Sequence, residues 1–90
     1  MRSIRTTSKF KKDLKRMKRR GLDISLLREV VKQLAAGKSL PAKNRDHPLE
    51  GEYSGKRECH IAPDWLLIYS VKENNLILIL MRTGTHSDLF

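Results

Sequence analysis

The sequence predicts a small α+β domain with elements in the order β-α-α-β-β-β. Two stretches within residues 7–36 carry apolar side chains at helical spacing, and three segments within residues 56–81 are apolar and of strand length. A polar segment at residues 39–49 contains two prolines and separates these halves as a loop. With no repeat or linker in 90 residues, we expect residues 1–90 to form a single domain.

The first helix has clear signals at both ends. Residues 3–6 are expected to form a short strand, after which Thr7 or Ser8 offers an N-cap oxygen. The helix should run to about Arg20, with Gly21 as its stop. A narrow apolar stripe crosses this otherwise cationic helix at Phe10, Leu14 and Met17.

A second helix is expected between Asp23, as N-cap, and Gly37. Its apolar stripe is wider and consists of Leu26, Leu27, Val30, Val31 and Leu34. The short glycine-containing turn between the two helices predicts an antiparallel pair.

Strands are expected over residues 56–61, 65–71 and 76–81, with a turn at 73–75. The last two are apolar almost without alternation. That pattern predicts strands covered on both faces, or partly covered by a partner.

The positive charge is concentrated at the beginning of the chain. Residues 1–20 carry ten Lys or Arg and one acidic residue, 10 − 1 = +9, whereas residues 21–90 carry nine of each sign, 9 − 9 = 0. Such a surface attracts polyanions, so nucleic acid, an acidic protein and an anionic membrane surface are all candidate partners. The plainer alternative is a solvated helix face.

Several classes of protein are disfavoured. No apolar run is long enough to span a bilayer and no signal peptide is present, which predicts a soluble cytoplasmic protein. Of the three candidate partners, the membrane is not expected. The single cysteine, Cys59, excludes an internal disulfide and is interpreted as a small buried residue. The three histidines lack the helical spacing of common zinc motifs, so we expect no metal and no other cofactor.

Candidate catalytic residues lie in the second half, at His47, His60, Asp64 and His86. Histidine accepts and donates protons near neutrality, and RNA supplies its own nucleophile, the 2′-hydroxyl. Arg82 is a candidate for holding the phosphate bidentately. Spacing alone does not show that these groups converge. Alternative roles are a surface histidine at each position, a turn at Asp64 and a surface cation at Arg82.

Two aromatic residues have competing interpretations. Trp65 fits the core better than a base-stacking surface. Phe90 is either a frayed terminus or a platform on which a base stacks.

Three segments together resemble the YafQ-type toxins of the RelE/ParE superfamily: Asp46 to Gly51, His60 to Tyr69, and Arg82 to Phe90. The resemblance spans essentially the whole chain, and its specific part lies in residues 46–90. It implies a microbial-ribonuclease-like fold, an antiparallel sheet with two helices on one face. It also implies cleavage of mRNA in the ribosomal A site.

The resemblance assigns catalytic positions to His47, His60, Asp64 and His86, with Arg82 and Phe90 in support. His86 is then the general acid, and His47 and His60 are base or phosphate ligand. It further implies a cognate antitoxin, with operator DNA bound only through the toxin–antitoxin complex. The basic helix would contact ribosomal RNA or acidic antitoxin residues, and its candidate contacts are Lys11, Lys12, Lys15 and Arg16.

Two other functions remain open from the residues. A ParE-like gyrase inhibitor has the same scaffold and needs no catalysis. A basic nucleic-acid-binding module would tolerate loss of His86.

Overall fold

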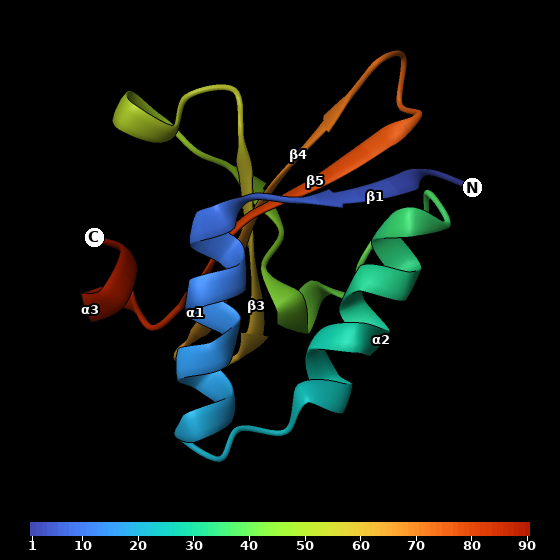
Figure 1. Ribbon diagram of the computed structural model, residues 1–90. Coiled ribbons are helices and arrows are strands. Elements are labelled where there is room, and N and C mark those ends of the chain that lie inside the picture. Colours follow the sequence, from blue (N-terminus) through green and yellow to red (C-terminus); the bar gives the residue numbers. More distant parts are fainter.

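The computed structural model describes residues 1–90 and shows a five-stranded sheet with two helices, α1 and α2, on one face (Figure 1). The strand order is β1-β5-β4-β3-β2. The elements are β1 (Ser3–Thr6), α1 (Ser8–Arg19), α2 (Ile24–Ala35), β2 (His47–Pro48), β3 (Arg57–Ala62), β4 (Trp65–Lys72), β5 (Ile77–Gly84) and α3 (His86–Leu89), with 3₁₀ turns at Ala42–Asn44 and Gly51–Tyr53.

The predicted α+β class and the two helices are confirmed. Thr7 caps α1 by accepting a hydrogen bond from the Phe10 backbone N–H at 3.0 Å. Asp23 caps α2 in the same way, accepting from the Ser25 N–H at 3.0 Å.

The sheet is mixed rather than antiparallel throughout. β3, β4 and β5 are joined by hairpins and pair antiparallel, but β1 pairs with β5 in parallel. No hairpin constrains β1, because two helices and a loop separate it from the other strands. The structure also adds β2 and the short helix α3, which the sequence pattern did not predict.

The larger core lies between the helices and the sheet. Phe10 and Met17 of α1 and Leu27 and Leu34 of α2 pack against buried side chains of the sheet, among them Leu67. Met17 and Leu67 have no exposed surface. At roughly 1.5–3 kcal/mol for each fully buried large apolar side chain, this cluster is the main source of stability.

The opposite face of β4 is also covered. Leu66 and Ile68 pack with Leu89 of α3, and Tyr53 and Met81 flank them. The prediction that the apolar strands are covered on both faces therefore holds for β4. The longest helices, α1 and α2, have 12 residues each, and none of the helices could span a bilayer.

Candidate active site

A carboxylate between two imidazole rings forms the centre of the candidate site. β2 pairs with β3 so that His47 lies opposite Glu58, two residues before His60 on the same face of β3. Glu58 Oε1 lies 3.3 Å from His47 Nε2 and 3.6 Å from His60 Nε2. The Glu58 side chain is only 6% exposed, so its charge acts mainly on these two rings.

His86 enters the same site from the C-terminal side. It is the first residue of α3, and its ring centroid lies 5.9 Å from that of His60, with 64° between the ring planes. Asp64 Oδ1 lies 3.1 Å from His86 Nδ1 and accepts the His86 backbone N–H at 3.3 Å. These hydrogen bonds hold the pKa of Asp64 below its ordinary value. The four candidate catalytic residues thus lie in one continuous group.

Aromatic rings border this group. The exposed ring of Phe90 packs edge-on against Tyr53 with centroids 5.6 Å apart, and lies 6.4 Å from the His86 ring. Trp65, by contrast, is buried and donates its Nε1–H to Thr83 Oγ1 at 2.9 Å. The interpretation of Trp65 as a core residue is confirmed.

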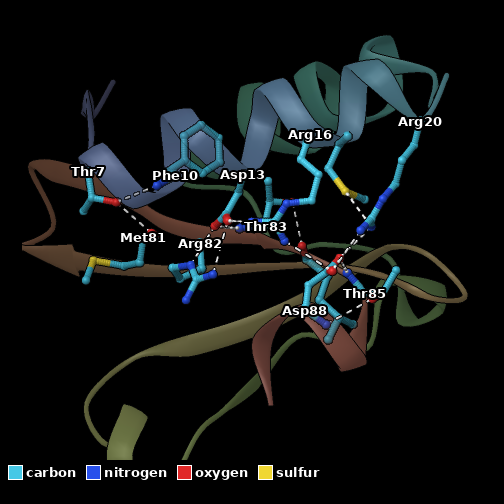
Figure 2. A network of polar contacts seen from close by, with 12 residues as sticks. Thr7, Phe10, Asp13, Arg16, Arg20, Met81, Arg82, Thr83, Thr85 and Asp88 are labelled. Carbon is cyan, nitrogen blue, oxygen red and sulfur yellow. Dashed lines mark hydrogen bonds and ion pairs between the residues drawn. The ribbon is translucent and has the colours of Figure 1, made fainter.

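Arg82 lies within β5, two residues before the strand ends, rather than after it. Its Nε and Nη2 atoms donate to the buried carboxylate of Asp13 on α1, at 2.6 and 3.2 Å (Figure 2). This pairing raises the pKa of Arg82. Two of its three guanidinium nitrogens are therefore already bound to Asp13. This differs from the expectation that Arg82 is free to hold a phosphate bidentately.

Asp13 also completes the edge of the sheet. β1 pairs with β5 only as far as Leu80, so the backbone beyond that residue lacks a neighbouring strand. The Thr83 N–H donates to Asp13 Oδ2 at 3.2 Å, and the carboxylate thereby takes the place of a strand carbonyl. Asp13 is 2% exposed and receives Arg16 Nη2 as well, at 3.1 Å.

A second carboxylate fixes α3, the helix that begins with His86. Asp88 accepts Arg20 Nη1 and Nη2 at 2.7 and 3.0 Å, and Arg16 Nη1 lies 3.2 Å away (Figure 2). Asp88 and Thr85 form a reciprocal capping box at the start of α3. The hydrogen bonds from Arg20 and from the Thr85 N–H hold the pKa of Asp88 well below its usual range. A Cβ at Gly84 would lie 2.9 Å from Asp88, so this approach requires glycine.

The loop that leads to His47 is attached to the other face of the sheet. Asp46 Oδ1 accepts the Tyr69 hydroxyl at 2.6 Å and Arg57 Nε at 3.2 Å. Burial and the Asp46 carboxylate raise the pKa of Tyr69. Cys59, next to Glu58, has no exposed surface, and burial raises its thiol pKa to about 12. Its interpretation as a small buried residue is confirmed.

The candidate RNA contacts on α1 have different surroundings. Lys11, Lys12 and Lys15 are exposed and form no ion pair. Arg16 is half-buried and pairs with Asp13 and Asp88.

The sequence interpretation did not identify Glu58, Asp13, Asp88 or Tyr53 as parts of the site. For Glu58 a signal existed, because strand alternation already placed it on the face of His60. Asp13 is the only acidic residue in the first 20, but no local pattern connects it to Arg82.

The centre of the site has donors suited to a metal ion. One ligand atom from each of His47, Glu58 and His60 can lie within 4.8 Å of the others. Two imidazoles and one carboxylate form a ligand set that zinc sites use.

Comparison with known proteins relates the whole chain to one family. Residues 2–90 match the family described as a bacterial toxin of type II toxin-antitoxin system, YafQ. The mRNA interferase toxin YafQ of Escherichia coli strain K12 is 38% identical over 90 residues, which cover 99% of this chain and 96% of that protein.

Two solved structures show the same architecture. A metal-bound toxin from Helicobacter pylori is 47% identical with a TM-score of 0.93, and the match covers 100% of both chains. In the E. coli DinJ–YafQ complex, the matching chain is 37% identical with a TM-score of 0.90, covering 100% of this chain and 99% of that one.

Proposed function

The chain belongs to the YafQ family of bacterial type II toxins, whose E. coli member is an mRNA interferase. On this basis we propose a mechanism for its activity. It is an endoribonuclease. We propose that it cleaves mRNA on the ribosome by acid–base catalysis, with the RNA 2′-hydroxyl as nucleophile. The supporting observation is the continuous group of three imidazoles and two carboxylates on one face of the molecule.

His86 is the general acid in this mechanism. Asp64 contacts Nδ1 and stabilises the protonated ring, while no protein group contacts Nε2. The His86 side chain is 57% exposed, so that nitrogen is accessible to a bound phosphodiester. His86 donates its proton to the 5′-oxygen as the P–O5′ bond breaks.

His60 is the general base. Its ring lies between the His86 ring and the Glu58 carboxylate, which together orient it. It removes the proton of the 2′-hydroxyl, and the 2′-oxygen attacks phosphorus to form a 2′,3′-cyclic phosphate. Each proton transfer contributes roughly 10²–10⁴ in rate.

His47 lies beside the phosphate and acts on it through charge rather than through a direct hydrogen bond. Its Nδ1 lies 3.0 Å from the Pro48 carbonyl oxygen and its Nε2 3.3 Å from Glu58, so both nitrogens face acceptors. Arg82 contributes positive charge through the part of its guanidinium that Asp13 leaves open, and Phe90 provides an exposed ring on which a base stacks.

A metal ion is not needed for this chemistry, although a relative has been solved with metal bound. Were a divalent cation to bind here, His47, Glu58 and His60 would hold it. It would polarise a phosphoryl oxygen or acidify a bound water. It would also occupy the His60 nitrogen that the proposed proton transfer uses.

Two macromolecular partners follow from the same proposal. The exposed lysines of α1 contact ribosomal RNA in the active state, through charge. An antitoxin inhibits the toxin, as suggested by the E. coli DinJ–YafQ complex, and operator DNA is bound only through such a complex.

Brief induction in cells, followed by mapping of mRNA 5′ ends, tests this function. We expect cuts in phase with codons that disappear in His86→Ala, whose fold should be intact because the residue is largely exposed. Intact transcripts with altered DNA supercoiling would instead identify a gyrase inhibitor and refute the proposal.

A further inference from the structure

A hollow with a volume of about 460 Å³ lies at the edge of the sheet, next to His60. Its walls are the segment Lys43 to Arg45 on one side and the end of β3 with Pro63 on the other. Because His60 is part of the wall, this hollow borders the candidate active site. Its volume falls within the roughly 300–1,000 Å³ typical of ligand pockets.

Two features of the segment Lys43 to Arg45 shape the hollow. Asn44 is buried and donates its Nδ2–H to the backbone carbonyl of His60 at 2.7 Å. Arg45 has a left-handed backbone with φ 47°, which turns the chain so that His47 can pair with Glu58. The wall of the hollow and the position of His47 are therefore set by the same turn.

The charge of the hollow is positive and uncompensated. Lys43 and Arg45 are both exposed, no carboxylate lines the hollow, and neither cation forms an ion pair. Several other arginines of the chain do pair with aspartates, among them Arg20, Arg57 and Arg82. Two adjacent free cations beside an apolar wall of Ala62 and Pro63 fit a ligand that is part anion and part ring.

We propose that this hollow is a nucleotide subsite. It holds the nucleotide next to the scissile phosphate, beside His60. Lys43 and Arg45 bind its phosphate, and Pro63 packs against its sugar or base. The RNA strand then runs from Phe90 and His86 across His60 into the hollow. This inference rests on the proposed ribonuclease function and defines the path of its substrate.

The test compares short RNA probes that cannot be cleaved because the reacting nucleotide is 2′-deoxy. The probes are a dinucleotide spanning the scissile bond and two trinucleotides, extended by one nucleotide on the 5′ or the 3′ side. Binding is followed by amide chemical shifts of the ¹⁵N-labelled protein. We expect all three to shift His60 and His86, and only one trinucleotide to shift residues 43–45 as well.

That trinucleotide should also bind roughly two- to tenfold more tightly than the dinucleotide, since each exposed charge pair contributes up to about fivefold. The gain should be lost in Lys43→Gln/Arg45→Asn, in which asparagine tolerates the left-handed backbone. The matched control Arg28→Gln/Lys72→Gln removes one exposed lysine and one exposed arginine elsewhere and should retain the gain.

Two results with the RNA probes overturn the subsite. One is a shift of His60 and His86 by all probes with none at residues 43–45. The other is an affinity gain that survives the double substitution. A failure of every probe to shift His60 and His86 refutes the proposed catalytic site itself. An acidic antitoxin peptide that shifts residues 43–45 when no nucleotide does would assign the hollow to a protein partner and overturn the inference.

Discussion

Asp13 binds Arg82 through Nε at 2.6 Å and Nη2 at 3.2 Å, across 69 positions of sequence. The pair connects the basic helix α1 to the strand that leads into α3. Because Asp88 binds two more arginines around α1, the position of His86 depends on a set of ion pairs as well as on apolar packing.

Asp13→Asn should destabilise the protein by about 3 kcal/mol, because it leaves Arg82 without its buried counter-charge. Chemical denaturation at neutral pH measures this loss. Arg82→Gln provides the double-mutant cycle. If the two losses simply add in the double variant, the pair does not make the contribution described.

The stability that Asp88 contributes should depend on pH. Its pKa is lowered in the folded state, so its contribution is complete above the unfolded value of about 3.9 and is lost as pH falls toward the folded value. Asp88→Asn should cost about 1.5–3 kcal/mol at pH 7, the usual range for hydrogen bonds to charged groups. The difference between wild type and variant should narrow below pH 4. A difference constant from pH 7 to pH 3 would contradict this.

Asp64 should act through His86 alone. We expect His86→Ala to lower the single-turnover cleavage rate by roughly 10²–10⁴-fold, and Asp64→Asn to lower it by less. The double variant should be no slower than His86→Ala, because the carboxylate then has no ring to stabilise. Thermal unfolding should barely change, since both side chains are more than half exposed. Additive effects on the rate would mean that Asp64 has a separate role.

Divalent metal should inhibit cleavage rather than support it. Treatment of the toxin with EDTA, which is removed before ribosomes are added, is expected to leave the cleavage rate unchanged. Micromolar Cu²⁺ or Zn²⁺ should lower the rate by occupying His47 and His60. Glu58→Gln should raise the inhibition constant of the metal by at least roughly tenfold. Loss of a residue that only supports a metal ligand already has an effect of this size. Because the variant is also slower, the comparison is made on inhibition constants. Restoration of activity by metal after EDTA would reverse the proposed role.

The lysines of α1 should govern the salt dependence of ribosome binding. Lys11→Gln/Lys12→Gln/Lys15→Gln should weaken binding at low salt and reduce the slope of log K against log salt by about 2. Arg16 is left unchanged because it pairs with Asp13 and Asp88. The control triple variant, Lys32→Gln/Lys38→Gln/Lys72→Gln, removes the same charge elsewhere. Equal slopes of log K against log salt in the two triple variants would show that α1 does not contact the ribosome.

Local signals were sufficient for the helices and for part of the site. Thr7 and Asp23 are caps because their side chains reach backbone groups two or three residues away. Contacts over so short a distance along the chain can be predicted from the sequence. Strand alternation is local in the same way: Glu58 and His60 are two positions apart and therefore share a face of β3.

Long-range contacts explain what the sequence did not reveal. The polar run from Arg82 to Gly84 looked like the end of a strand, yet it remains in β5 because Asp13 and Trp65 satisfy its polar groups. The helix α3 has four residues, too few for a periodic pattern, and is held by Arg20 from 68 positions away.

The enclosed sulfur of Cys59 has a practical consequence for studying this molecule. With its pKa raised to about 12 and no exposed surface, the thiol is almost entirely unreactive toward maleimides at neutral pH. A cysteine introduced on the surface would therefore take a fluorophore at a single position, without removal of the natural residue. Alkylation of Cys59 would then report only those molecules in which the sheet has opened.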